Sequence, residues 1–423
     1  MTVLIAGAGI TGLTLAISCQ QAGIPFAIFE QVSEIKPLGV GINVQPHAIR
    51  ELFEMGLEAE LEATGVRTRE VSYFSKKGGL IWSEPRGQFA GYKWPQYSVH
   101  RGTFQMMLLK ALQDIAGADV VKTDRRAVNV VDTENGVRVT LRNRAGKESA
   151  IEGTVLIACD GIHSDIRAKF YPDEGAPHWG GSILWRGTAR GKPFITEATM
   201  GMAGHEWQKF VTYPISKTDP ETGEAEINWI AELKFPPDKK WNREDYNRKG
   251  NFDDFFPAFA DWKFDWLDIP KLMQDGGYCY EFPMVDRDPV EQWTFGSTTL
   301  AGDAAHAMYP IGSNGASQGI LDARVLVREF LKHGVGVAAL QAYEAERRPA
   351  TTRLVMANRG NGPDHVMNIV EERCEGAFDD ISEVLSREEL SETAAAYKKI
   401  AGMDVEGLNN RASIVELPEK DVA

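Results

Sequence analysis

A glycine-rich turn near the start of the chain limits the fold more than any other feature of the sequence. Three glycines follow the pattern G-x-G-x-x-G between an apolar run at 2–6 and an apolar-rich stretch at 10–22: Gly7, Gly9 and Gly12. The pattern predicts a strand, a tight turn and a helix, and a second β-prone run follows at 26–29. Such a βαβ unit implies a parallel sheet.

The same turn predicts a dinucleotide site. Its glycines let the backbone approach a pyrophosphate closely, and the N-terminus of the following helix faces the phosphate charge. Glu30 ends the second strand, 18 residues after Gly12, where a carboxylate can accept hydrogen bonds from the ribose hydroxyls of adenosine. The motif alone does not distinguish FAD from NAD.

Composition and charge exclude several functional classes. The 423 residues are 43% hydrophobic and 25% charged, which is typical of a globular protein with two to three domain-sized units. A net charge of -14 provides no basic surface for nucleic acid or an anionic membrane. We find no signal peptide and no apolar run long enough to span a membrane, so a cytoplasmic location is expected. The four cysteines and eight histidines show no metal-ligand spacing, and no metal is expected.

Two later segments place an aspartate directly after an apolar strand. The first, VLIACDGIHSDIR, contains Asp160, and the second, TTLAGDAAHAMYPIGSNGA, contains Asp303. Asp303 can accept hydrogen bonds from ribityl hydroxyls. A helix is expected from about Gly315 to His333, and its positive end would face the pyrimidine side of a flavin and stabilise negative charge on the reduced ring.

In order and approximate spacing, GAGITG, CDGIHSDIR and AGDAAHAMYP resemble the three fingerprints of the class A flavoprotein aromatic hydroxylases. The resemblance implies non-covalent FAD, with NADH or NADPH as a transient co-substrate. It also implies that Asp160 and Arg167 lie near the cofactor, that Arg101 contacts its phosphate or ribityl region, and that PLGVGIN lies beside the isoalloxazine ring. The expected cofactor-binding residues are Gly7, Gly9, Thr11, Gly12, Glu30, Gly41, Arg101, Asp160, Asp303, Pro310, Gly315 and Ala316.

The resemblance extends to one branch of the family. WSEPRG, PQYSVHRG, ILWRG, YPIS, PMVDRDP and YEAERRP are similar to segments of the methylphenazine-carboxylate hydroxylases of phenazine biosynthesis. The branch implies a small aromatic or fused N-heteroaromatic acid, phenazine-like or salicylate-like, with loss of the carboxylate as an open alternative. By the family's chemistry, a C4a-hydroperoxyflavin formed from O2 would hydroxylate the ring, and no side chain is expected to act as a catalytic group.

We expect an α/β fold in which a discontinuous, Rossmann-like FAD-binding domain carries an inserted antiparallel substrate sheet, followed by C-terminal helices. The expected parts are 1–174 for the first FAD-binding segment, with substrate-side segments around 70–100, then 175–286 for the substrate sheet, 287–345 for the second FAD-binding segment and 346–423 for the helical region. Short alternating runs at 182–188, 209–214 and 227–233 support the sheet. The expected substrate-binding residues are Trp185, Arg186, Tyr213, Trp229 and Met284. A monomer and a homodimer both remain open.

Three other functions have some support in the sequence. GASQG at 315–319 matches G-x-S-x-G, but a proline- and glycine-containing loop precedes it where a serine hydrolase needs a strand. Trp262 and Trp266 before Ile269 partly resemble a signature of flavin-dependent halogenases, with the wrong spacing. A non-catalytic binding module with a flavin-type fold is the third alternative, and the colour of the purified protein would test it.

Overall fold

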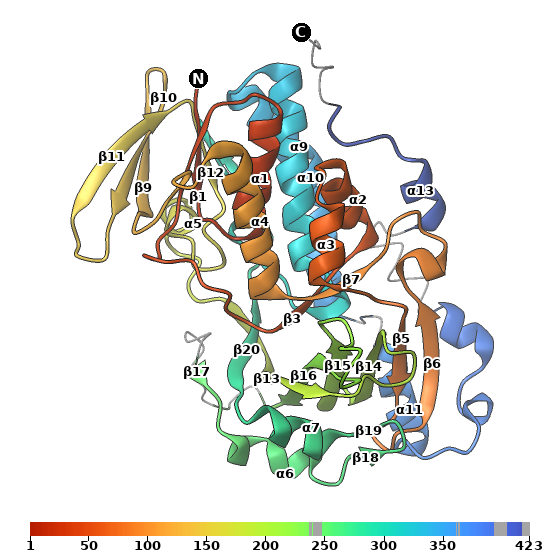
Figure 1. Ribbon diagram of the computed structural model, residues 1–423. Coiled ribbons are helices and arrows are strands. Elements are labelled where there is room, and N and C mark those ends of the chain that lie inside the picture. The colour runs from red at the N-terminus through yellow and green to blue at the C-terminus, as the bar shows by residue number, and fades with distance from the viewer. Residues whose placement is uncertain (237–238, 240–247, 361, 363, 393–403, 417–423) are drawn as a thin grey trace.

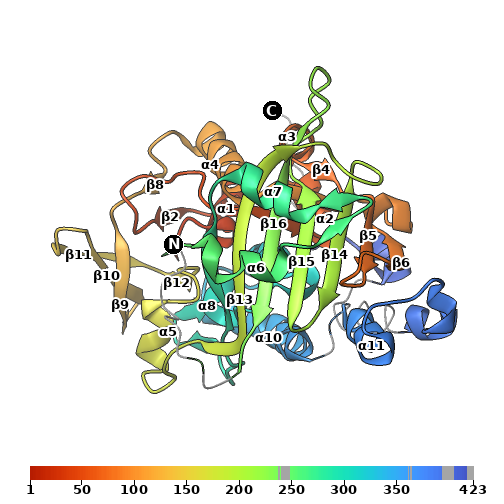
Figure 2. The same cartoon turned by 90° about the horizontal axis from the view of Figure 1, so that it is seen from below.

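The computed structural model describes residues 1–236, 239, 248–360, 362, 364–392 and 404–416. A six-stranded sheet with its helices lies above an eight-stranded sheet (Figure 1). Figure 2, seen from below, shows the short helices α6 (Phe256–Phe259) and α7 (Ile269–Gly276) lying across the lower face of the eight-stranded sheet.

The six-stranded sheet has the order β21-β22-β12-β1-β2-β8. Its strands are β1 (Val3–Ala6), β2 (Phe26–Phe29), β8 (Val121–Lys122), β12 (Val155–Ala158), β21 (Thr294–Phe295) and β22 (Thr298–Leu300). All pairs are parallel except β21 with β22. Every residue of β1 and β12 is buried, as in a parallel sheet covered on both faces. The parallel sheet expected from the βαβ pattern is confirmed.

Helices pack against this sheet and against one another. They are α1 (Ile10–Gln21), α2 (Pro46–Glu54), α3 (Glu58–Thr64), α4 (Arg101–Ala116), α5 (Asp165–Phe170), α8 (Asp303–His306), α9 (Gly315–His333) and α10 (Val337–Arg359). The long helix α9 lies beside α1 and α10 (Figure 1). It spans the residues that the sequence predicted and ends at Gly334, whose φ is +76°.

The apolar pattern of residues 48–61 predicts a single helical stretch from Ala48 to Leu61, and the structure shows that this prediction is wrong. The structure has two helices there, α2 and α3, because Gly56 adopts a φ of +82° between them. A left-handed glycine ends an α-helix readily since it has no Cβ to clash with the backbone.

Two small sheets complete the upper part of the molecule. One is a projecting antiparallel sheet of β9 (Arg126–Thr133), β10 (Gly136–Arg142) and β11 (Glu148–Gly153). The other contains β3 (Gly41–Val44), β4 (Val66–Arg67) and β7 (Tyr97–His100). Gly41 pairs with His100, which brings the loop before β3 to the N-terminus of α4.

The eight-stranded sheet has the order β17-β20-β13-β16-β15-β14-β5-β6. Its strands are β5 (Glu70–Phe74), β6 (Leu80–Pro85), β13 (His178–Gly191), β14 (Thr199–His205), β15 (Gln208–Pro214), β16 (Ala225–Lys234), β17 (Arg248–Lys249) and β20 (Tyr280–Asp286). Its pairs are antiparallel except β14 with β5. The antiparallel sheet expected from the alternating runs is confirmed, and one parallel pair joins it to the earlier segment.

The two faces of this sheet have different surroundings. On the lower face, an aromatic cluster lies between the sheet and helices α6 and α7 and includes Trp185, Trp229, Phe255 and Phe259. The upper face turns towards the six-stranded sheet and its loops. Because successive side chains in a strand point to opposite faces, each strand divides its residues between the cluster and the space above it.

Beyond α10, the described residues lie partly beside the eight-stranded sheet and partly beside the upper helices, where Ser413 donates a hydrogen bond to Glu54 of α2. Helix α11 (His365–Cys374) packs against β14 and β6, and α13 (Val405–Asn410) follows, with the 3-10 turn η4 (Ile381–Glu383) between them. The described part of the expected helical region at 346–423 therefore contains helices, while 393–403 and 417–423 lie outside the described residues. No helix in the described part of the chain is both long enough and apolar enough to cross a bilayer.

Candidate functional site

A cavity of about 330 Å³ lies between the loops of the six-stranded sheet and the upper face of the eight-stranded sheet. Its lining contains eight of the expected site residues from the upper part: Gly9, Thr11, Gly41, Arg101, Asp303, Pro310, Gly315 and Ala316, together with Cys159 and Gly161 on either side of Asp160. From the sheet it contains Arg186, Tyr213 and Met284. Segments far apart in the sequence thus share one cavity.

The glycine turn has the geometry that a dinucleotide needs. A Cβ at Gly7 would lie 2.4 Å from the carbonyl oxygen of Cys159, and one at Gly12 would lie 2.0 Å from that of Gly7. These two glycines are therefore required for close packing of β1, α1 and β12. Gly9 has no heavy atom within 4 Å of its would-be Cβ and faces the cavity. The turn leaves open the position where a pyrophosphate would approach the backbone.

Glu30 lies just after β2 and braces the same turn. One carboxylate oxygen accepts a hydrogen bond from the Ala8 amide at 2.9 Å, and the other accepts one from the Val32 amide at 3.0 Å. The side chain is half-buried. This position matches the one expected for a ribose-binding acid, and the structure adds that Glu30 also holds the glycine turn in place.

Asp160 and Arg167 follow β12, but they have different environments. The Asp160 oxygen Oδ1 has no hydrogen-bond partner among the described residues, and burial raises the pKa of its carboxyl group to about 6. Arg167 is fully buried and does not line the cavity. Its Nη1 donates to the carbonyl oxygens of Ala304 at 3.0 Å and Ala305 at 2.9 Å, so it fixes α8 from below.

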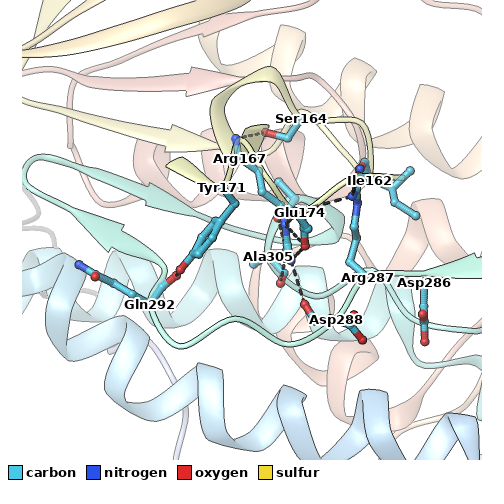
Figure 3. A network of polar contacts seen from close by, with 12 residues as sticks. Ile162, Ser164, Arg167, Tyr171, Glu174, Asp286, Arg287, Asp288, Gln292 and Ala305 are labelled. Carbon is cyan, nitrogen blue, oxygen red and sulfur yellow. Dashed lines mark hydrogen bonds and ion pairs between the residues drawn. The ribbon is translucent and has the colours of Figure 1, made fainter. Parts of the chain in front are cut away.

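Figure 3 shows the polar network around Arg167. Glu174 pairs with both Arg167 and Arg287, and the Arg167 Nη2 donates to the Asp288 carbonyl at 2.9 Å. The family resemblance implied that Arg167 lies near the cofactor. In the structure Arg167 is outside the cavity lining and supports the turn that carries Asp303.

Asp303 begins α8 and is exposed to the cavity. The preceding Gly302 has a φ of +58°, and a Cβ there would lie 2.4 Å from the Thr11 hydroxyl. Gly319 on α9 is equally close to this hydroxyl, with a separation of 2.2 Å from its would-be Cβ. Thr11 therefore packs between two glycines, which brings α1, α8 and α9 together around the cavity.

The N-terminus of α9 also meets the cavity, since Gly315 and Ala316 are both in its lining. Backbone amides in the first turn of a helix provide positive potential for a ligand with developing negative charge. Ser317, the serine of the G-x-S-x-G match, is fully buried, and its hydroxyl accepts a hydrogen bond from the Gln45 amide at 3.0 Å. It is not an exposed nucleophile, so the geometry gives no support to a serine hydrolase.

The floor of the cavity is the upper face of the eight-stranded sheet. Side chains two residues apart contribute to it: Leu184 and Arg186, Met200 and Met202, Lys209, Val211 and Tyr213, Ile230 and Glu232, and Met284. Trp185 and Trp229 are fully buried on the opposite face, where the Trp185 ring stacks on Phe255 at a centroid distance of 4.9 Å. The assignment of these two tryptophans to the substrate pocket is therefore corrected.

Arg186 is the notable charge on this floor. Its Nη2 donates to the Gly41 carbonyl at 2.8 Å, and its guanidinium lies 5.5 Å from the Phe282 ring centroid. Among the described residues no carboxylate pairs with it, and its Nε has no hydrogen-bond partner. Burial lowers the pKa of Arg186 from its ordinary value, yet an arginine stays charged. Arg186 is therefore a suitable partner for an anion inside the cavity.

Sequence reasoning missed three charged residues in the cavity wall. Lys209 Nζ lies 2.7 Å from an oxygen of Asp364 and 3.3 Å from one of Glu232. Lys209 is two residues from Val211 and four from Tyr213, so strand alternation would have placed it on the cavity face. Asp364 gave no such signal because it is 155 residues away in the chain.

Comparisons with known proteins identify the family and the fold. A family model described as FAD binding domain matches residues 1–176 and 282–358. The chain is 43% identical over 361 residues to phenazine 1,6-dicarboxylic acid hydroxylase of Lysobacter antibioticus, covering 84% of this chain and 89% of that protein. It is 26% identical over 376 residues to 3-hydroxybenzoate 6-hydroxylase of Polaromonas naphthalenivorans, covering 86% and 87%. The fold is similar to that of a salicylate hydroxylase in its substrate complex, with a TM-score of 0.72, 19% identity and coverage of 99% and 98%.

Proposed function

The chain belongs to the FAD binding domain family and is an FAD-dependent aromatic hydroxylase, and from this premise we propose that its substrate is a fused, nitrogen-containing aromatic acid. The resemblance to flavoprotein aromatic hydroxylases is thereby confirmed. As a monooxygenase of this family it uses FAD, O2 and a reduced nicotinamide.

The residues of the upper cavity fit FAD. We assign the pyrophosphate to the turn at Gly7, Gly9 and Gly12, where Gly9 leaves open space, and the adenosine ribose to Glu30. Asp303, exposed at the cavity, would bind the ribityl chain, and the first turn of α9 would face the pyrimidine side of the ring. The other members of the proposed cofactor set are Thr11, Gly41, Arg101, Asp160, Pro310 and Ala316.

FAD supplies the difficult chemistry, because once reduced by NADH or NADPH it activates O2 for transfer of one oxygen atom to an aromatic ring. The side chains of this protein bind the substrate, orient it and exclude water. Met200, Met202, Val211 and Ile230 make the floor apolar, which suits a flat aromatic ring and keeps water away from it. No side chain is required as a nucleophile.

The environment of Arg186 is the observation that supports this substrate class. A guanidinium without a carboxylate partner, set in an apolar floor, is matched best by a carboxylate of the ligand. Tyr213 lies on the same face, and burial raises the pKa of its hydroxyl to about 12, so it stays protonated and can donate a hydrogen bond. Met284 completes this proposed substrate set. The relative with 43% identity is named for a phenazine dicarboxylic acid, which supports a fused ring over a single one.

The division of the chain is part of the proposal. We assign FAD binding to 1–174 and 287–345, substrate binding to 175–286 with the segments around 70–100, and the covering helices to 346–423. A cytoplasmic location, a monomer or homodimer, and the lack of nucleic-acid and membrane partners remain predictions from composition and charge.

The absorbance spectrum of the purified protein tests the cofactor, and NADH and NADPH oxidation with a panel of acids tests the substrate. We expect flavin bands and oxidation stimulated by phenazine-1-carboxylate more than by salicylate. Labelled O2 should place one labelled atom in each product molecule. Stimulated oxidation without labelled product would contradict hydroxylation, and equal response to every acid would contradict the proposed substrate class.

A further inference from the structure

A second cavity of about 300 Å³ adjoins the first. The two cavities share Lys209, Glu232, Met284, Ile311 and Asp364 in their linings. From there the second cavity continues past Ser182, Lys234 and Tyr309 to His178 and Glu206, which are exposed. It therefore leads from the substrate end of the first cavity to the surface of the molecule.

Three charges stand where the cavities meet. Lys209 and Glu232 are buried, and Asp364 is largely so. Lys209 donates to Asp364 at 2.7 Å and lies 3.3 Å from Glu232. Burial alone would lower the pKa of Lys209, but the two carboxylates outweigh it and raise the pKa above the ordinary value. Lys209 in turn lowers the pKa of the Asp364 carboxyl in spite of its burial, so both members of this pair are charged at neutral pH.

A buried cluster of charges is unusual in a part of the cavity lining that has only a structural role. Buried charges are costly to desolvate, and apolar side chains of similar volume often stabilise a fold as well or better. The surrounding floor is in fact apolar, with Val211 and Ile230 in the next row of the sheet. An ion pair also differs from an apolar contact in being exchangeable, because a lysine can leave one carboxylate for another.

We propose that the second cavity is the passage by which the aromatic acid enters and its product leaves, with Lys209 and Asp364 forming the partition between passage and reaction site. The inference rests on the proposed function, in which FAD fills the side of the first cavity lined by Gly9, Arg101 and Asp303. With that side closed, the ring needs another route. The ammonium group of Lys209 exchanges Asp364 for the carboxylate of the entering acid and then returns.

A removable plug at the mouth tests the passage. His178→Cys places a thiol at an exposed residue of the second cavity, where a bulky methanethiosulfonate reagent can be attached and later released with dithiothreitol. Ser149→Cys, on the exposed strand β11, is the matched control, and the labelled wild type controls for Cys374, the one described cysteine that is not buried. Both variants should retain bound flavin.

The measurement is stopped-flow binding of phenazine-1-carboxylate, with salicylate as a second probe. At His178→Cys the label should slow association and dissociation by about tenfold each and leave Kd within about threefold, because a passage affects rates and not the bound state. Reduction should restore both rates, and the label at Ser149→Cys should change neither. Unchanged rates in the plugged protein would overturn the passage.

The partition is tested by Asp364→Asn, which keeps the shape of the side chain and weakens its hold on Lys209. Association and dissociation should both accelerate several-fold, with Kd nearly constant. A changed Kd with unchanged association would show that the cluster only shapes the bound state and would overturn its role as a partition. If unlabelled wild-type protein binds neither probe, the proposed substrate class fails and the passage fails with it, whereas binding that ignores the plug refutes the passage alone.

Discussion

His306 on α8 and Asp322 on α9 form a buried pair, with the imidazole Nε2 2.6 Å from a carboxylate oxygen and both side chains fully buried. The same carboxylate accepts hydrogen bonds from the Gly302 amide at 2.9 Å and from Arg347 Nε at 2.8 Å. Asp322 on α9 therefore ties together the loop before α8 and the helix α10. His306 is buried and does not line the cavity, so its role is structural.

Replacing this carboxylate should destabilise the protein. Asp322→Asn leaves Arg347 buried without its counter-charge, and we expect the free energy of unfolding at pH 7 to fall by about 3 kcal/mol. Urea denaturation measures the loss. Asp114→Asn removes an exposed pair with Lys110 and should cost well under about 1 kcal/mol. An equally small loss of unfolding free energy in both variants would show that the buried Asp322 cluster contributes no more to stability than the exposed pair.

The same residue predicts how stability depends on pH. Burial alone would raise the pKa of Asp322, but His306 and Arg347 outweigh it and lower the pKa to about 2. Its contribution is thus complete above the unfolded pKa of about 4 and is lost as the pH falls from about 4 towards 2, about 2 kcal/mol in all. The difference between wild type and Asp322→Asn should shrink over that range in urea titrations. A difference that stays constant from pH 7 to 3 would contradict the pKa direction.

Local signals in the sequence were enough to predict the parallel sheet and the long helix α9. The glycine turn sits between an apolar strand and an apolar helix, and both ends of α9 carry glycines, so pattern and end signals agree. The prediction of a single helix at 48–61 was wrong because the apolar pattern continues across Gly56, whereas the helical conformation of the backbone is interrupted there. Only the structure shows that this glycine is left-handed.

Two glycine substitutions separate packing from cofactor binding. Gly12→Ala forces a Cβ to within 2.0 Å of the Gly7 carbonyl, so we expect a loss of about 2 kcal/mol in stability. Gly9→Ala meets open space, so its stability should change by less than about 1 kcal/mol, while the affinity of the apoprotein for FAD falls about tenfold or more. Urea unfolding and FAD titration measure the two effects. Unchanged FAD affinity in Gly9→Ala would remove this glycine from the proposed cofactor site.

The candidate site was predictable to the extent that it depends on local motifs. The turn at Gly9, the exposed Asp303 and the start of α9 were found from short patterns, and the structure brings them to one cavity. The Lys209 and Asp364 pair was not found, because it depends on how a distant segment packs against the sheet. In the eight-stranded sheet, Trp185 and Trp229 were expected in the substrate pocket because they are aromatic. The alternation of side chains along each strand instead puts them on the opposite face.

Arg186 should govern recognition of the carboxylate. In Arg186→Met, we expect Kd for phenazine-1-carboxylate to rise about 10-fold to 100-fold, since a charge-assisted hydrogen bond is lost. Binding of phenazine-1-carboxamide, which has no charge, should change by less than about threefold. Arg186→Lys keeps the charge without the planar fork and should fall between the two. Fluorescence titration measures the Kd of both ligands for the wild type and both variants. An equal rise in Kd for the acid and the amide would show that Arg186 acts through shape alone.

Trp185 on β13 and Tyr213 on β15 lie in the same sheet but point to opposite faces. We therefore expect substitution of the first to affect stability and substitution of the second to affect substrate binding. Trp185→Phe removes part of a fully buried stacked pair with Phe255, and we expect a loss of about 1 to 2 kcal/mol in unfolding free energy with no change in substrate Kd. Tyr213→Phe removes only a hydroxyl at the cavity floor, so we expect little change in stability and a Kd several-fold weaker. Parallel urea denaturation and ligand titration distinguish the two residues. Weaker substrate binding by Trp185→Phe with unchanged stability would contradict the assignment of Trp185 to the lower face of the sheet. The tryptophan would then have to contact the substrate from the cavity side.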